Sequence, residues 1–467
     1  MKCPLAEKGC GSCRELTRMY GDVLHEKDAP FRALFPDALP ILGMAEPRAY
    51  RNKVLRTFAN GKSGLYHGIY RAGTHQVISV RRCLMENERA NEIANIALSL
   101  LAETGLSAYR EDFHRGILRH MQVRRAHSTG QALVTIVTGT ADFPGGEAFA
   151  RRLMARCPDV RGVTQSINDR DTSAVMGFRS RVLAGRDEIW DELGGLKVCL
   201  TARSFYQINT VQAEKLYQRA IDLAQLTPGD RVLDAYCGVG LIGMLAARRA
   251  GQVRGVELVR DAVACARTAA RVNRISNIDF ICADAVNALR DDDFVPTVVF
   301  VDPPRAGCDA RFLRSLSQAA PERIVYVSCC PETLRRDVDI LRKAGYALQS
   351  AQPVDLFPYT AHTETVCQLV LRNPVTHINI DVDVEELVQD KRGQATYPQI
   401  KEYVLEHSGL RVSSLYIAQV KQKYGIIERE NYNKPKSDNA KQPQCPPDKE
   451  KAIEEALRHF GMIGTQD

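Results

Sequence analysis

Hydrophobic and polar positions follow two different periods in the first half of the chain. From residue 50 to about 192, alternating runs at 77–80 and 132–137 indicate strands. Between them, apolar residues at 93–101 have the spacing of a helix. This mixture predicts an α+β unit.

Past residue 203 the pattern changes to short β-rich runs that alternate with longer helical ones, as far as about residue 373. The expected strands are 231–235, 253–257, 279–282, 297–302 and 323–328. This alternation is typical of a parallel sheet with crossover helices. We therefore expect an open, doubly wound α/β domain of the Rossmann-like kind.

The two ends of the chain differ from these units. Residues 1–47 carry a cysteine cluster without clear periodicity, which suggests a short metal-held segment. After residue 374 a helical pair is expected at 397–407 and 413–424, then a polar linker at 430–449 and a last short helix. The predicted domains are thus 1–47, 48–195, 196–373 and 374–467.

Length and composition set the class of the protein. A chain of 467 residues, 45% hydrophobic and 25% charged, is long enough for two or three folded cores. No apolar stretch approaches the ~20 residues of a membrane span, and the start does not resemble a signal peptide. We expect a cytoplasmic, monomeric protein without a membrane partner. The net charge of +7 is compatible with a polyanionic partner.

A glycine-rich segment, Asp234-Ala-Tyr-Cys-Gly-Val-Gly-Leu-Ile-Gly243, follows an expected strand and opens a helix. Its glycines allow the backbone to approach a ligand, and the pattern also fits a nicotinamide dinucleotide site. The acid at the strand end would face a pyrophosphate unfavourably, whereas it would favour a positively charged sulfonium. The segment therefore favours a methyl-donor cofactor.

Two further acids end the next strands. Glu257 stands where a carboxylate can accept both ribose hydroxyls of a nucleoside, although a solvated strand-end acid is the alternative. Asp284 is placed to bind an adenine amino group, but an aspartate after a strand is often only a helix cap.

An acid and a thiol end two neighbouring strands beside the same crevice. Asp302 lies in Asp302-Pro-Pro-Arg305, and Cys329 ends Tyr326-Val-Ser-Cys329. A thiolate adds readily to an electron-poor double bond and later leaves easily. The pair is therefore a candidate for covalent catalysis.

Together with Ser204-Phe-Tyr-Gln-Ile-Asn209 and His362-Thr-Glu364, these motifs resemble those of the RNA uridine C5-methyltransferases, the RlmC, RlmD and TrmA family. The resemblance covers about residues 1–373 and is closest to the RlmC-like 23S rRNA (uracil-C5)-methyltransferases. It implies a class I methyltransferase domain that uses S-adenosylmethionine to methylate C5 of a uridine in RNA. The expected substrate is 23S rRNA, with tRNA as the alternative.

The resemblance also implies roles for single residues. Gln207, Tyr236, Glu257 and Asp302 are expected to contact S-adenosylmethionine. Cys329 is expected to add to C6 of the uracil, and Glu364 to remove the C5 proton after methyl transfer. These roles come from matching motifs, residue by residue.

One position departs from the family pattern. Cys330 follows the nucleophile where the family usually has asparagine. An inactive RNA-binding relative is therefore an alternative. An amine-directed methyltransferase is disfavoured because Arg305 replaces the aromatic residue of its motif, and a nicotinamide oxidoreductase would leave Cys329 and Glu364 without roles.

Four cysteines form a candidate metal site: Cys3, Cys10, Cys13 and Cys83. Four thiolates can hold a [4Fe-4S] cluster or a zinc ion, and the spacing excludes neither. Resemblance to the RlmC-like members implies [4Fe-4S].

Basic and aromatic side chains gather in the central unit. They are suited to neutralising RNA phosphates and to stacking on unpaired bases. They are Tyr50, Arg51, Lys53, Arg56, His114, Arg115, Arg119, His120, Arg124 and Arg125. Solvated strand faces are the alternative. A uridine within a helix cannot reach Cys329, so a loop base or a flipped-out nucleotide is expected.

For the helical pair near the C-terminus, RNA binding and partner docking both stay open.

Overall fold

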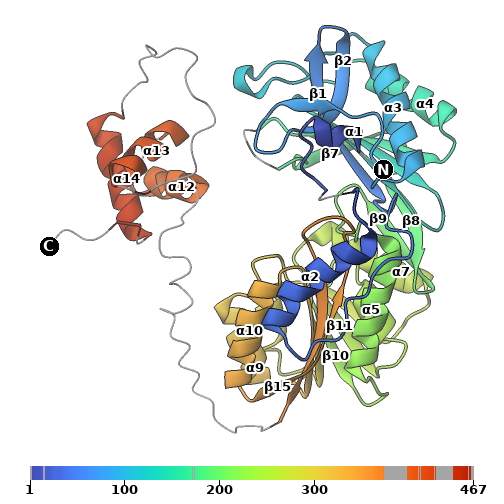
Figure 1. The fold of residues 1–467 in the computed structure, drawn as a ribbon, viewed down its shortest axis with the longest axis vertical. Helices are drawn as coiled ribbons and strands as arrows, with labels where there is room; N and C mark the ends of the chain where they lie inside the picture. The colour runs from blue at the N-terminus through green and yellow to red at the C-terminus, as the bar shows by residue number, and fades with distance from the viewer. Residues whose placement is uncertain are drawn as a thin grey trace. The chain divides into compact units, whose positions relative to one another are not determined.

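The computed structural model describes residues 3–13, 16–170, 172, 174–372, 397–408, 410, 412–424, 426, 445–460 and 462–463. The chain divides into two compact units, Met1–Ile378 and Asn379–Asp467, coloured from blue to orange and in red in Figure 1. Among the described residues, no helix is both long enough and apolar enough to span a membrane.

The N-terminal segment contains a helix that the sequence analysis missed. After the short α1 (Pro4–Glu7), the helix α2 spans Tyr20–Leu34. Its buried residues Val23, Lys27 and Phe31 recur every four positions, which is one face of a helix. The lysine in the middle of this face and Pro30 inside the helix obscured the pattern.

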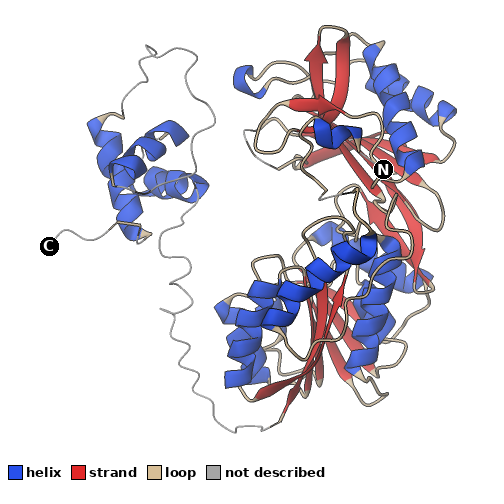
Figure 2. Cartoon of the chain, in the orientation of Figure 1, coloured by secondary structure: helices blue, strands red, loops and turns tan. Residues whose placement is uncertain are grey.

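The central part of the first unit is a seven-stranded sheet covered by helices on one face (Figure 2). Its strand order is β3-β2-β1-β4-β5-β6-β7, and every described pair is antiparallel except the parallel pair β5 and β6. The elements are β1 (Lys53–Gly61), β2 (Gly64–Tyr70), β3 (Val77–Ser79), α3 (Glu88–Ala102), β4 (Leu118–Arg125), β5 (Ala132–Thr138), α4 (Gly146–Arg156), β6 (Val160–Ile167) and β7 (Arg179–Gly185). The expected α+β unit is therefore present.

The two faces of this sheet differ in character. Val54 and Phe58 of β1 pack with α3 and α4 in the apolar core. Because side chains alternate along a strand, Lys53 and Thr57 lie on the opposite face. Their partners across the β1–β4 pair are Arg124 and His120. The sheet thus has one apolar face and one polar face.

A hairpin connects the two sheets of the first unit. Its strands are β8 (Glu188–Leu193) and β9 (Leu196–Thr201), so it crosses the domain boundary expected after residue 195. Ile189 and Leu200 are buried in the same core cluster as the strands of the second sheet.

The second sheet has the strand order β12-β11-β10-β13-β14-β16-β15. The first five strands are parallel, and β16 runs antiparallel to both of its neighbours. The strands are β10 (Arg231–Ala235), β11 (Gln252–Glu257), β12 (Ile278–Cys282), β13 (Val298–Val301), β14 (Arg323–Ser328), β15 (Tyr346–Val354) and β16 (Glu364–Leu371). The helices are α5 (Thr210–Ala224), α6 (Leu241–Ala246), α7 (Arg260–Val272), α8 (Ala285–Ala288), α9 (Ala310–Ala319) and α10 (Pro331–Lys343). The predicted doubly wound fold is confirmed, and all five strands expected from the sequence are present.

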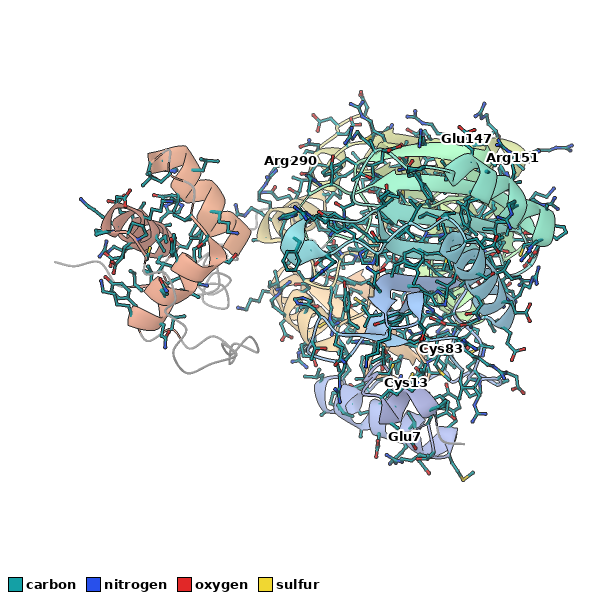
Figure 3. The ribbon with its side chains drawn as sticks, turned by 90° about the horizontal axis from the view of Figure 1, so that it is seen from above. Glu7, Cys13, Cys83, Glu147, Arg151 and Arg290 are labelled. Carbon is teal, nitrogen blue, oxygen red and sulfur yellow. The ribbon has the colours of Figure 1, made fainter. Side chains whose placement is uncertain are left out.

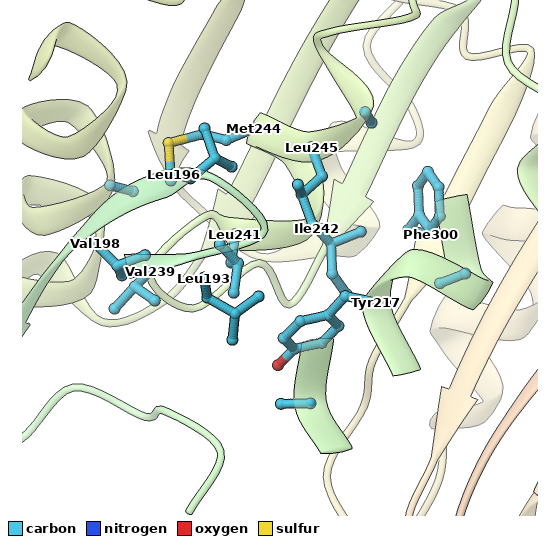
Figure 4. Packing of buried hydrophobic residues seen from close by; sticks show 14 of the residues in the cluster. Leu193, Leu196, Val198, Tyr217, Val239, Leu241, Ile242, Met244, Leu245 and Phe300 are labelled. Atoms are coloured by element: carbon cyan, nitrogen blue, oxygen red, sulfur yellow. The ribbon is translucent and has the colours of Figure 1, made fainter. Parts of the chain in front are cut away.

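The core of this domain lies between the sheet and the helices α5, α6 and α7. Figure 4 shows Leu241 and Ile242 of α6 packed near Tyr217 of α5 and Phe300 of β13. Phe300 is fully buried in the middle of the sheet. Burial of such side chains stabilises the folded domain by about 25 cal/mol per Å² of apolar surface. This packing holds the strand ends in fixed positions.

In the part of the second unit that the structure describes there are three helices, α12 (Tyr397–Ser408), α13 (Ser414–Lys423) and α14 (Pro447–His459). Ile400, Ile417 and Leu457, one from each helix, share a single buried cluster. The predicted helical pair and the last helix are therefore present. The predicted linker at 430–449 lies outside the described residues as far as 444.

Candidate active site

The expected site residues meet at one edge of the second sheet. Tyr236, Asp302 and Cys329 directly follow the parallel strands β10, β13 and β14, and Glu257 ends β11. Glu364 begins the antiparallel β16, whose second residue pairs with the end of β14. Because parallel strands end at the same edge, these side chains surround the switch point between β10 and β13, where open α/β sheets bind ligands.

The loop after β10 is tight because of its glycines. Gly238 and Gly240 have φ angles of 54° and 77°, in the left-handed region that glycine tolerates. A Cβ atom on Gly240 would lie 2.4 Å from the ring of Phe280. Tyr236 also adopts a φ of 62°, which a tyrosine rarely does. The loop therefore brings its backbone close to the crevice.

Asp234 does not have the role expected from the sequence. It is within β10, 1% exposed, and its Oδ2 accepts a 2.7 Å hydrogen bond from the backbone N–H of Gly243. Burial raises the pKa of its carboxyl to about 8. This acid holds the glycine loop from inside the domain, so the prediction that Asp234 would face a ligand's pyrophosphate is wrong.

Glu257 and Asp284 are held by backbone amides. The Glu257 carboxylate accepts hydrogen bonds from Gly238 N, at 3.1 Å, and from Val259 N, at 2.9 Å, so it is fixed against the glycine loop. The Asp284 carboxylate accepts from Val286 N at 2.9 Å and caps α8, which is the alternative noted for it. Both are partly exposed at the sheet edge.

Gln207 is 6% exposed, in the segment before α5. Asn52, just before β1, donates from Nδ2 to the Gln207 carbonyl at 2.9 Å. Asn209 donates to the carbonyl of Leu356 at 2.9 Å, in the segment that leads to Glu364. The segment around Gln207 is thus held on one side by Asn52 and on the other by the carbonyl of Leu356.

Cys329, Glu364 and Asp302 are within electrostatic reach of one another. Burial, and then the charges of Glu364 and Asp302, raise the pKa of Cys329 to about 11, while Arg305 opposes this shift. Glu364 is 3% exposed, and burial followed by the charge of Asp302 raises its pKa to about 8. Burial alone raises the pKa of Asp302 to about 7. A positive charge bound here would favour the ionised carboxylates.

The neighbouring Cys330 makes different contacts. Its thiol donates to Oε2 of Glu332 at 3.2 Å, and its backbone N–H donates to Oγ of Ser328 at 3.2 Å. It is the N-cap residue of α10. Its thiol is therefore engaged with an acid on the first turn of that helix.

Comparison of the chain with known proteins identifies its family. A sequence profile of the tRNA (uracil-5-)-methyltransferase family matches residues 196–372. An uncharacterized RNA methyltransferase of Halalkalibacterium halodurans is 35% identical over 79% of this chain and 83% of its own length. Another, of Oceanobacillus iheyensis, is 38% identical with the same coverage. The chain belongs to the RNA uridine C5-methyltransferase family.

One solved structure supports the methyltransferase fold over most of the chain. It is the Pyrococcus abyssi tRNA (uracil-54, C5)-methyltransferase, solved in complex with S-adenosyl-L-homocysteine. The two proteins are 25% identical with a TM-score of 0.65, and the match covers 75% of this chain and 84% of the other.

A cavity of about 470 Å³ opens beside the methyltransferase's Cys329. One side is formed by Arg305, Cys329 and Thr363 of the sheet edge, and the other by Lys27 and Phe31 of α2. The N-terminal helix is thus a wall of the candidate site, which the sequence analysis did not anticipate.

A buried ion pair joins α2 to the segment before Glu364. Lys27 Nζ lies 2.6 Å from Oδ1 of Asp355, and also donates to the carbonyls of Phe357 and His362 at 3.0 and 2.9 Å. The other oxygen of Asp355 accepts from the Tyr20 hydroxyl at 2.7 Å. The spacing of Tyr20, Val23, Lys27 and Phe31 is the signal that could have identified this helix.

Tyr217 is a second residue that the sequence did not indicate. It is 6% exposed on α5, and Figure 4 shows its ring among apolar side chains. Burial, and then the nearby charge of Asp302, raise the pKa of its hydroxyl, with a smaller effect of Glu364. It is therefore within electrostatic reach of these acidic side chains. A tyrosine on an apolar helix face carries no signal of this position.

Cys3, Cys10, Cys13 and Cys83 line one cavity of about 360 Å³. Figure 3 labels Cys13 and Cys83 beside the N-terminal segment. Burial raises the pKa of Cys13 to about 12, Arg51 opposes this shift, and the other three thiols add to it. Within the described residues, however, no group of three or more histidine, cysteine or acidic side chains is arranged to hold a metal ion. The metal site stays a prediction.

Proposed function

We propose that this methyltransferase uses S-adenosylmethionine to methylate C5 of a uridine in RNA, with Cys329 as the nucleophile and Glu364 as the base. The observation that carries the proposal is the grouping of a thiol and two carboxyls with raised pKa values, Cys329, Glu364 and Asp302, at one sheet edge. Perturbed titratable groups in a crevice are typical of catalytic sites.

The crevice suits S-adenosylmethionine. Its sulfonium is a cation, and Glu257, Asp302 and Glu364 place acids around the switch point. Glu257 is fixed beside the glycine loop for the ribose, while Gln207, Tyr236 and Asp284 border the same edge. The S-adenosyl-L-homocysteine in the Pyrococcus abyssi enzyme supports this assignment. When bound, the cofactor supplies an electrophilic methyl group.

The protein's own residues provide the remaining chemistry. C5 of uracil is a poor nucleophile until the ring's conjugation is broken. The Cys329 sulfur, after losing its proton, forms a bond to C6 and moves electron density onto C5. Once C5 carries the methyl group, the Glu364 carboxylate takes the C5 proton, the sulfur–C6 bond breaks and the thiolate is released.

Covalent trapping tests this proposal. In RNA that contains 5-fluorouridine, C5 carries fluorine in place of the proton that Glu364 removes, so the Cys329 adduct should persist on a denaturing gel. We expect Cys329→Ala to abolish the adduct and the matched variant Cys330→Ala to retain it. An adduct in the Cys329→Ala variant would overturn the mechanism. No adduct in the wild type would favour an inactive RNA-binding relative.

We further propose 23S rRNA as the substrate, on the resemblance to the RlmC-like enzymes. The alternative is tRNA, which is favoured by the matching family profile and by the Pyrococcus abyssi enzyme. Transfer of radioactive methyl groups to 23S rRNA fragments and to tRNA, compared in parallel, decides between them.

The polar face of the central sheet supports an RNA partner. Lys53 and Arg124 are directly opposite each other on β1 and β4, and neither makes an ion pair with a residue that the structure describes. Burial and the charge of Arg124 lower the pKa of Lys53 to about 8, and burial lowers that of Arg124 to about 10. Lys53 is partly exposed and can bind a phosphate, while Arg124, which is 2% exposed, adds a positive charge beside it.

We also infer a [4Fe-4S] cluster at Cys3, Cys10, Cys13 and Cys83. A cluster needs room between its four thiolates, which a cavity of about 360 Å³ provides. A zinc ion would instead need all four sulfurs about 2.3 Å from one centre, so a cavity of this size favours the larger cluster. Arg51 borders the same cavity and supplies a positive charge beside the thiols.

A further inference from the structure

A second cavity, of about 450 Å³, lies in the central unit, between the β1–β2–β4 region and the segment before β4. It is lined by aromatic, imidazole and guanidinium groups, a combination suited to flat, polar rings. The relevant lining residues are Thr57, Tyr70, His75, Tyr109, Arg119 and His120. None of them belongs to the proposed catalytic site.

One side of this cavity is rigid. Arg119 is 4% exposed and is fixed by an ion pair of 2.9 Å with Glu111 and by a 2.7 Å hydrogen bond to the carbonyl of Asn168. Its guanidinium lies 4.9 Å from the centre of the Tyr109 ring. The arginine and the tyrosine therefore hold each other in place before any ligand arrives.

The other side is open. Tyr70 ends β2 and is 37% exposed, although a tyrosine ring is usually more covered than this. His75, also exposed, packs edge-to-face against it with ring centres 5.9 Å apart. The open Tyr70 ring offers a surface on which an unpaired base can stack.

His120 supplies a polar group inside the cavity. It is 7% exposed, and Nδ1 pairs with Oγ1 of Thr57 at 3.2 Å. Its Nε2 has no hydrogen-bond partner among the described residues. Burial, and then the charge of Arg119, lower the pKa of His120 to about 4, so the ring is neutral at physiological pH. A neutral imidazole nitrogen can bond to the edge of a base.

The cavity is within reach of the candidate active site. His120 and Arg124 share the polar face of β4, and four residues of strand span about 14 Å. Arg124 donates to the carbonyl of Ser204 at 2.7 Å, three residues before Gln207. The partly exposed Lys53 and the buried Arg124 thus lie between the cavity and the cofactor motif, and Lys53 can contact a passing phosphate backbone.

We propose that this cavity binds one unpaired base of the RNA strand, a few nucleotides from the target uridine. The inference rests on the proposed function, since it assumes that the strand enters the site at Cys329. An RNA strand fits better than a peptide because Glu111 is already paired with Arg119, whereas the neighbouring cations Lys53 and Arg124 have no acidic partner among the described residues. The cavity then helps to select the RNA sequence around the target.

The test combines RNA and protein changes. In the RNA that the wild type methylates, each nucleotide beside the target is replaced in turn by an abasic one. One such position should raise KM about tenfold with kcat unchanged, as expected for the loss of one stacked base. Tyr70→Leu should raise KM equally on intact RNA but add nothing on that abasic RNA, while Tyr70→Phe, which keeps the ring, should behave as the wild type.

Two results would overturn the inference: no abasic position that affects KM, or effects of Tyr70→Leu and of the abasic nucleotide that multiply. Tyr70 is on the surface, so these variants should fold, and their unchanged binding of S-adenosylmethionine is the control. If the wild type forms no adduct with 5-fluorouridine RNA, the proposed function fails instead. Affinity for a labelled single-stranded 12-nucleotide RNA then still tests the cavity, because Tyr70→Leu should weaken it several-fold and equal affinities would refute base binding.

Discussion

Replacing Lys27 by methionine should destabilise the first unit strongly. The side chain of Lys27 is 6% exposed and that of Asp355 is fully buried. Methionine has nearly the same length, so the cavity is small and the main effect is electrostatic. Asp355 would keep only the Tyr20 hydroxyl as a side-chain donor. Removing one partner of a buried ion pair costs about 3–5 kcal/mol, because a charge is left without compensation.

The assay can isolate the first unit. The chain has one tryptophan, Trp190, which lies in β8, so its fluorescence during urea unfolding reports on this unit. We expect Lys27→Met to lower the free energy of unfolding by about 3–5 kcal/mol. Arg32→Met, which removes a more exposed ion pair with Asp28 on the same helix, should cost less than about 1 kcal/mol.

A double variant separates charge from packing. Lys27→Met combined with Asp355→Asn removes both charges and should recover most of the lost stability. The single variant should also release product slowly, because Lys27 holds the carbonyls of Phe357 and His362 just before Glu364. A loss below about 1 kcal/mol in Lys27→Met, or no recovery in the double variant, would refute the reasoning.

Four further predictions concern the proposed sites and the second unit. Because the pKa of Glu364, about 8, lies above its unfolded value, its contribution to stability is present at low pH and is lost as pH rises through 8. Glu364→Gln should therefore be more stable than the wild type at pH 9 by a few kcal/mol, at roughly 1.4 kcal/mol per pKa unit, and equal unfolding curves there would contradict this. Affinity for S-adenosylmethionine, measured by calorimetry, should rise between pH 6 and 8 as Asp302, with a pKa of about 7, ionises. The uncharged sulfur of S-adenosylhomocysteine should show a weaker dependence, and parallel profiles would exclude an effect of the sulfonium. Protein purified without oxygen should hold about four iron atoms per chain, lost in Cys83→Ser and kept in the matched Cys445→Ser, whereas zinc found by elemental analysis would reverse the assignment. A chain ending at residue 372 should fold and methylate a minimal RNA loop as the full chain does, since every proposed catalytic residue precedes that point, and loss of folding would show that the second unit supports the first. If the second unit binds RNA, the truncation should also flatten the salt dependence of binding to long ribosomal RNA fragments, and an unchanged slope would favour partner docking.

Local sequence predicted most of the second sheet. Its strands are short apolar runs, and this pattern follows from burial on both faces of a parallel sheet. The chemistry-bearing residues Tyr236, Glu257, Asp302 and Cys329 could be placed together because parallel strands end at the same edge. The motifs and the strand order therefore place these residues at the same edge, and no side-chain contact has to be known for that. The roles of these residues in catalysis stay predictions, as do the cytoplasmic location and the monomeric state.

The direction of single side chains was less predictable. Asp234 lies in the strand that leads to Tyr236, and its buried carboxylate accepts a hydrogen bond from Gly243 N. Asp284 caps α8, one of the two interpretations that the sequence allowed. The type of a residue at a strand end does not fix which neighbour it contacts, because backbone amides of the adjacent loop compete with a ligand for the same carboxylate.

By itself, the sequence determined the doubly wound sheet, the glycine loop and the residues at the strand ends, since each depends on a period or a motif within a few tens of residues. Only the tertiary structure decided that α2 forms a wall beside Cys329, that Lys27 pairs with Asp355 and that Tyr217 is within electrostatic reach of Asp302. Lys27 and Asp355 are 328 positions apart, and neither segment alone contains the other's charge. A lysine on an apolar helix face is stable only when a buried acid meets it, and that meeting is set by the packing of distant segments rather than by local sequence.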